Sequence, residues 1–118
     1  MIRDDLAEQR QRHRQLLAAA LRQIVATLSE NPDVERAVLF GSYAEGRSDL
    51  FTDLDILIVI HSPLDFVTRT AEMYRLLSCP VDLDLLVYTP DEVERNRHRG
   101  LIRQALEKGR VIYEKRAA

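Results

Sequence analysis

The stretch GSYAEGRSDLFTDLDILIVI, residues 41–60, decides the fold prediction. It opens with a loop rich in small residues and ends at 54–60 in an apolar, largely β-branched run that is typical of a buried strand. Because side chains alternate faces along a strand, Asp53 and Asp55 project to the same side of it. A shorter apolar segment at 34–40 runs into the loop and predicts the preceding strand.

Outside this stretch, the spacing of apolar residues predicts helices that alternate with strands. Leu17, Leu21, Ile24 and Leu28 recur every three or four residues and therefore line one face of an amphipathic helix. The first two strands are joined by only about a dozen residues, so we expect them to be antiparallel, whereas a helix between the second and third strands allows a parallel crossover. The further predicted elements are a helix with Pro63 in its first turn, a strand at 81–88, a helix from Thr89 until Gly109, and an edge strand at 111–113.

The chain has the size of one domain, with 118 residues. We expect a small mixed sheet flanked by helices, of the α/β (α+β) class, with an N-terminal helix at about 3–30, a core at about 34–94, and a C-terminal helix and edge strand at about 95–115. The formal charge of -2 gives no global basic field, so direct DNA binding is not expected. One cysteine and short apolar runs favour a cytoplasmic protein without a membrane segment.

Two further carboxylates stand at the start of the predicted third strand. Asp82 and Asp84 share a strand parity, as Asp53 and Asp55 do, and parallel strands begin at the same end of a sheet. Clustered carboxylates raise one another's pKa values unless a cation compensates, and Mg²⁺ prefers carboxylate, water and phosphate oxygens. Acidic pairs at strand starts are often solvated turn residues, but that role does not require matched acids on two strands. The pattern predicts a site for Mg²⁺, with room for two ions.

The loop that follows the first strand suits an anion. Gly41 permits close backbone approach, and Ser42 offers a hydroxyl and an amide at the start of a short helix expected at 43–45. Free amides at such a turn attract phosphate oxygens, although a simple tight turn has the same composition. We expect this loop to lie beside Asp53.

At this point the chain resembles a known family. The run from Gly41 to Gly46, the gap of ten residues between Ser42 and Asp53, and the strand after Asp55 are similar to the GSx10DxD signature of the minimal nucleotidyltransferases, in the DNA polymerase beta superfamily. The similarity extends through VDLDLLVYTPDE at 81–92, which looks like the segment that carries the family's third carboxylate. It covers about residues 34–94 and implies the nucleotidyltransferase fold.

The resemblance also implies roles for single residues. Gly41 and Ser42 would hold the triphosphate of ATP, while Asp53, Asp55 and a third acid would bind Mg²⁺ and act in catalysis. The position of Thr89-Pro90 favours Asp84 as the third acid, with Asp82 as the alternate. Family members often carry Arg or Lys where this chain has Glu45, and Arg47 lies close enough to replace that phosphate contact.

The resemblance implies a protein acceptor as well. Family members of this size act as antitoxins that transfer AMP to a tyrosine of a partner HEPN-domain ribonuclease toxin. A domain this small has little surface left to enclose another substrate, which agrees with an acceptor supplied by a partner. The alternatives are a catalytically weak or inactive antitoxin that neutralises its partner by binding, which Glu45 favours, and an aminoglycoside-type nucleotidyltransferase, which needs a homodimer to form its substrate wall.

Overall fold

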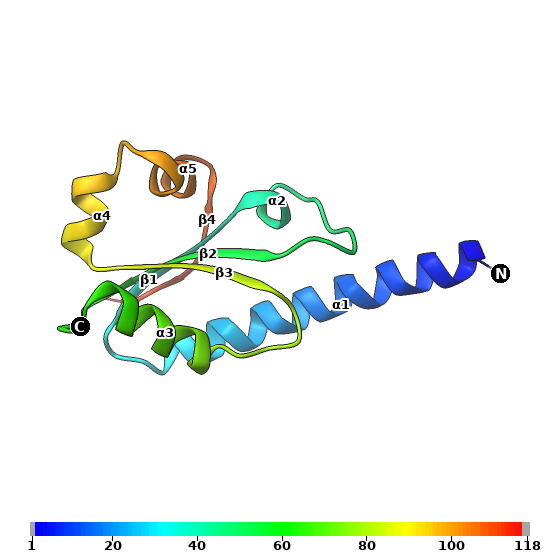
Figure 1. Ribbon diagram of the computed structural model, residues 1–118, viewed down its shortest axis with the longest axis horizontal. Helices are drawn as coiled ribbons and strands as arrows, with labels where there is room; N and C mark the ends of the chain where they lie inside the picture. Colours follow the sequence, from blue (N-terminus) through cyan, green and yellow to red (C-terminus); the bar gives the residue numbers. More distant parts are fainter. Residues whose placement is uncertain (1, 117–118) are drawn as a thin grey trace.

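A computed structural model describes residues 2–116 and shows a mixed sheet with helices on both faces, from which one long helix projects (Figure 1). No helix in this part of the chain combines the length and the apolar character needed to cross a membrane. The elements, in chain order, are α1 (Ile2–Ser29), β1 (Val34–Phe40), α2 (Gly41–Ala44), β2 (Leu54–Ile60), α3 (Phe66–Leu76), β3 (Leu83–Tyr88), α4 (Pro90–Asn96), α5 (Gly100–Lys108) and β4 (Arg110–Glu114).

The sheet has four strands in the order β3-β2-β1-β4. β1 is antiparallel to β2 and to β4, and β2 is parallel to β3, so both predicted orientations are confirmed. The parallel pair arises because α3 carries the chain back to the starting end of β2. The C-terminal strand adds the edge expected from the sequence. The starts of β2 and β3 and the end of β1 therefore meet at one end of the sheet.

The two faces of the sheet bury different residues. One face packs against α1 through the predicted stripe, with Leu17, Ile24 and Leu28 fully buried and Leu21 packed at the margin. Residues of even number in β2, from Leu54 to Ile60, belong to this core. The other face carries Leu57 and Val59 of β2, Val38 and Phe40 of β1, and Ala105 of α5, in a second core. Asp53 and Asp55 share the parity of Leu57 and so belong to the face that α5 covers.

Several predicted boundaries differ from the structure, including the short helix expected at 43–45, which spans Gly41–Ala44. The helix expected to include Pro63 begins later, at Phe66, because the side chain of Asp65 caps it by accepting a hydrogen bond from the Thr68 amide at 2.8 Å. The third strand begins at Leu83 rather than at 81. The helix expected to run from Thr89 until Gly109 is two helices, because the chain turns at Gly100, which has a φ of +49°.

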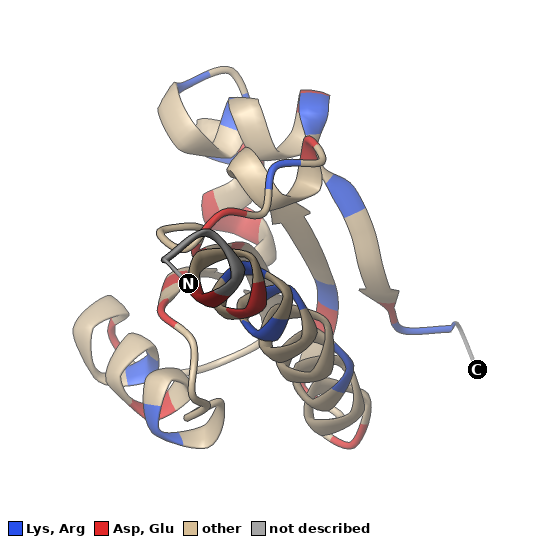
Figure 2. Ribbon diagram, turned by 90° about the vertical axis from the view of Figure 1, so that its right-hand side faces the viewer, with Lys and Arg blue, Asp and Glu red and all other residues tan. Residues whose placement is uncertain are grey.

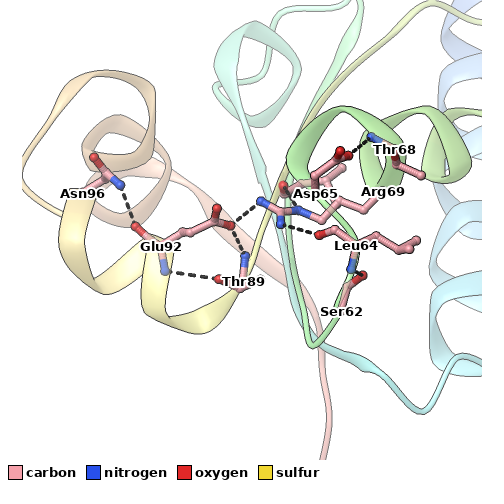
Figure 3. A network of polar contacts seen from close by, with 9 residues as sticks. Ser62, Leu64, Asp65, Thr68, Arg69, Thr89, Glu92 and Asn96 are labelled. Atoms are coloured by element: carbon pink, nitrogen blue, oxygen red, sulfur yellow. Dashed lines mark hydrogen bonds and ion pairs between the residues drawn. The ribbon is translucent and has the colours of Figure 1, made fainter.

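A buried arginine fastens α3 to the end of β3 and to α4 (Figure 3). The side chain of Arg69 is 6% exposed, donates to the carbonyls of Val87 and Leu64 at 3.1 and 3.2 Å, and pairs with the carboxylate of Glu92. Glu92 also accepts a hydrogen bond from the Thr89 amide and closes a capping box at the start of α4. Although burial opposes ionisation, hydrogen bonds and the charge of Arg69 lower the pKa of Glu92. This network fixes where α4 begins.

The hydroxyl of Tyr74 forms hydrogen bonds with the backbone of the edge strand β3. Tyr74 of α3 accepts a hydrogen bond from the amide of Leu85 at 2.9 Å and donates one to the carbonyl of Leu83 at 3.4 Å. These two backbone groups lie on either side of Asp84, on the edge of the sheet that no strand covers. Tyr74 therefore satisfies backbone groups that an edge strand otherwise leaves to water.

The first half of α1 extends beyond the sheet (Figure 1). Residues 5–12 are exposed, and from residue 5 on, Leu17 is the first fully buried residue of this helix. Seen from the N-terminal end, α1 contains both acidic and basic residues (Figure 2). The loop between α2 and β2 reaches toward the same segment of the helix. This projecting half of α1 depends on few contacts with the rest of the protein.

Candidate active site

Two carboxylates face each other where β2 and β3 begin. Asp55 and Asp84 are direct neighbours in the parallel register, so their side chains point to the same face of the sheet. Burial raises the pKa of Asp55 to about 6, and the charge of Asp84 and a hydrogen bond between the two carboxyls act in the same direction. A carboxyl with a pKa near neutrality in this position marks a place where a cation would be stabilised.

A second carboxylate pair lies just before the first. Asp53 precedes β2, and Asp82 precedes β3. The amide of Leu54 donates to the carbonyl of Asp82 at 3.1 Å, so the segments that lead into the two strands are already hydrogen-bonded here. Burial, followed by the charges of Asp82 and Asp84, raises the pKa of Asp53, while His13 opposes the shift. The four acids predicted to gather at one end of the sheet therefore do interact through their charges.

The glycine of the loop lies against one of these acids. Gly41 has a φ of +77°, and a Cβ atom at this position would lie 2.1 Å from Oδ2 of Asp55. The contact is with Asp55 rather than with the expected Asp53, because Phe40 at the end of β1 pairs with Asp55. Both the backbone angle and the space admit only glycine here.

The remaining loop residues form one tight turn. Gly41 and Ser42 open the four-residue helix α2, and the carbonyl of Ser42 accepts a hydrogen bond from the Arg47 amide at 2.9 Å. The guanidinium of Arg47 is mostly exposed and pairs with Glu45 at 3.0 Å. The structure thus places Gly41 beside Asp55 and Ser42 next to it in α2, whereas Arg47 is engaged by its neighbour on the loop.

An open cavity of about 410 Å³ adjoins the acids. Asp55, Asp84 and Gly41 form one part of its wall, and Leu101 and Gln104 of α5 form another. The sequence pattern gave no indication that α5 contributes, because its apolar spacing is that of any amphipathic helix. The cavity allows a ligand to reach the two carboxylates from the face covered by α5.

The acids fit a magnesium ion in their chemistry. Among residues 5–116, no three His, Cys, Asp or Glu side chains are arranged as a preformed metal site. Mg²⁺ needs less than this, since one or two carboxylates, water and substrate phosphate commonly complete its shell. Burial and the charge of Asp84 raise the pKa of Asp55, so a cation bound here would stabilise the ionised form of this carboxyl. Asp55 and Asp84 are the residues best placed to hold such an ion, with Asp53 adjacent.

Residues 22–118 match the family described as polymerase beta, nucleotidyltransferase. A protein of Methanocaldococcus jannaschii, named as a protein adenylyltransferase, is 32% identical over 80 residues, which cover 68% of this chain and 79% of that protein. The matched part of this chain contains the four aspartates Asp53, Asp55, Asp82 and Asp84 and the loop that begins at Gly41.

Solved structures show the same fold at lower identity. A protein of Sulfolobus solfataricus named as a nucleotidyltransferase superposes with a TM-score of 0.57 and 20% identity, over 93% of this chain and 87% of that chain. A chain from the Shewanella oneidensis complex of a tri-AMPylated HEPN toxin with an MNT antitoxin has a TM-score of 0.50 and 20% identity, over 83% and 72% of the two chains. Both are similar to this chain in architecture.

Proposed function

Because this chain belongs to the polymerase beta nucleotidyltransferase family, we propose that it is a magnesium-dependent protein adenylyltransferase. The substrate is ATP, the acceptor is a tyrosine hydroxyl of a HEPN-domain toxin, and the chain acts as the antitoxin. The similarity to a protein named as an adenylyltransferase supports the reaction, and the fold shared with an MNT antitoxin supports the partner.

One observation carries the proposal. Asp55 and Asp84 stand opposite each other on two strands, and Gly41 lies so close to Asp55 that no other residue fits. A half-buried carboxyl such as Asp55, whose pKa is raised by burial and by the charge of a neighbouring acid, weakens the fold, and selection retains such strain mainly where function uses it. The site is also open on the α5 side, through the cavity of about 410 Å³.

Each residue has a part in the proposed reaction. The loop amides at Gly41 and Ser42 bind the triphosphate and orient its α-phosphorus toward β2. Asp53, Asp55 and Asp84 would hold Mg²⁺, which when bound offsets the charge of the phosphates. A carboxylate oxygen of Asp84 receives the proton of the acceptor hydroxyl. The acceptor oxygen then bonds to the α-phosphorus, the bond between that phosphorus and the bridging oxygen breaks, and pyrophosphate leaves.

Mass spectrometry of the HEPN-domain partner tests this proposal. After incubation with ATP and Mg²⁺, the partner should gain the mass of one or more adenylates on tyrosine, and Asp53→Asn and Asp84→Asn should each reduce the rate at least about 100-fold. Asp82→Asn serves as the matched control, because Asp82 lies beside the site but outside the facing pair. An equal loss with Asp82→Asn and none with Asp84→Asn would exchange their roles.

A second candidate is neutralisation by binding alone. The ion pair between Glu45 and Arg47 favours this candidate. Because Glu45 pairs with the guanidinium of Arg47, that cation is less available to a phosphate. In that case the toxin would be inhibited in a stable complex, its mass would stay unchanged, and the Asp53→Asn variant would inhibit it as well as the wild type does. The same incubation therefore separates the two candidates.

A further inference from the structure

The projecting helix α1 touches the loop that leads into the site. Nε2 of His13 lies 3.1 Å from the carbonyl oxygen of Thr52, and since a carbonyl only accepts, the ring nitrogen carries the proton. Among residues 5–116, this is the hydrogen bond by which an α1 side chain reaches another element. His13 is half-buried, whereas the residues next to it on both sides are exposed.

The loop residue that receives this bond is itself held on every side. The side chain of Thr52 exchanges hydrogen bonds with Asp49, accepting from its amide at 2.9 Å and donating to its carboxylate at 3.2 Å. The amide of Thr52 donates to the carbonyl of Asp49 at 3.2 Å. With its carbonyl bound to His13 and only 5% of its surface exposed, Thr52 has all its polar groups paired.

Asp53 is therefore fixed from both of its neighbours. On one side Thr52 is bound to His13, and on the other side the amide of Leu54 donates to the carbonyl of Asp82 at 3.1 Å. The second bond belongs to the pairing of β2 with β3 and persists as long as the sheet does. The first depends on one side chain that is 39 residues distant along the chain.

We infer that His13 is a positioning residue for Asp53: its hydrogen bond to the Thr52 carbonyl holds the 49–52 turn so that the Asp53 carboxylate keeps its place in the nucleotide and metal site. The inference rests on the proposed function only for the identity of the ligand that Asp53 binds. Outer-shell partners of this kind change ligand affinity or activity about 10- to 100-fold without touching the ligand. The same bond joins the projecting half of α1 to the site.

Three variants test this role. His13→Ala removes the donor, and because Ala favours the helix more than His does, α1 itself is not weakened. His13→Gln retains an amide donor on a side chain of similar reach. His98→Ala removes an exposed histidine between α4 and α5 and serves as the matched control. Thermal unfolding of each variant shows whether the fold is intact.

The first measurement is amide hydrogen exchange at 49–54 in the ligand-free protein. We expect exchange about 10-fold faster in His13→Ala, near wild-type exchange in His13→Gln, and no change in His98→Ala. The second is calorimetric affinity for Mg²⁺ with AMP-PNP, which we expect to fall about 10-fold in His13→Ala and to recover in His13→Gln.

Unchanged exchange in His13→Ala would overturn the inference, as would a loss of affinity that His13→Gln fails to restore. If the wild type does not bind Mg²⁺ with AMP-PNP, the proposed function fails instead, and the exchange measurement on ligand-free protein still decides whether His13 holds the turn.

Discussion

Replacing Asp55 by Asn should make the ligand-free protein more stable while it removes activity. Ionising Asp55 in the wild-type fold costs free energy, because this carboxyl is half-buried and lies beside the carboxyl of Asp84. The amide of Asn has nearly the same shape, carries no charge and can donate a hydrogen bond to Asp84. The repulsion therefore becomes an attraction.

The expected size follows from the raised pKa of Asp55. The pKa rises from 3.8 to about 6, and at about 1.4 kcal/mol per unit the upper limit is about 3 kcal/mol. The carboxyl is only half-buried, so solvent screening reduces the net effect to about 1 kcal/mol. For a domain of this size that gain raises Tm by roughly 3–6 °C.

The raised pKa of Asp55 also predicts how the stability of the wild type changes with pH. Because the folded pKa of Asp55 lies above its unfolded value, the wild type loses stability as pH rises from about 4 to about 6, whereas Asp55→Asn does not. The two proteins should be equally stable below pH 4 and should differ fully above pH 6.5.

Urea unfolding of both proteins without Mg²⁺, at several pH values, measures this difference. Glu72→Gln, which neutralises an exposed carboxylate on α3, is the matched control and should change stability by less than about 0.5 kcal/mol. The reasoning is refuted if Asp55→Asn is less stable than the wild type at pH 7.5, or if the difference does not vary between pH 4 and 7.

Other substitutions test separate contacts. Gly41→Ala should destabilise the protein by at least about 2 kcal/mol and abolish nucleotide binding, since its Cβ would overlap a carboxylate, whereas Gly46→Ala, with a φ of +89° and open space around it, should cost only about 1 kcal/mol in thermal unfolding. Arg69→Met should cost about 2–4 kcal/mol in urea unfolding, more than Glu92→Gln, because it leaves a carboxylate and two carbonyls without their donor; equal costs would contradict this. Phe51→Ser, at a side chain that is 90% exposed, should leave stability within about 0.5 kcal/mol, and a larger loss in calorimetry would show a packing role.

Local patterns in the sequence predicted the sheet and the acids on it. Alternation along 54–60 placed Asp53 and Asp55 on one face, and loop length distinguished the antiparallel link from the parallel one. The proximity of Gly41 to an acid followed from the same topology. The acid in contact is Asp55 rather than the expected Asp53, because of the register between β1 and β2. These features depend on residues that are close in the chain, so the spacing of apolar and polar residues in the sequence reveals them.

Contacts between distant segments left no such pattern. His13 gave the signal of any helical histidine, yet it binds Thr52, and Arg69 gave no sign that it would be buried beside Glu92. The wall of the cavity formed by Leu101 was missed for the same reason. The break between α4 and α5 was missed as well, since an isolated glycine such as Gly100 is tolerated within many helices.

The phenol of Tyr74 has a consequence for how another protein can approach. An exposed sheet edge invites an extended peptide to join as an extra strand, and at β3 that peptide would run past Asp84. Tyr74 already occupies the amide of Leu85 and the carbonyl of Leu83 at that step of the ladder. A strand from another protein could therefore pair with β3 at this step only by displacing the hydroxyl of Tyr74.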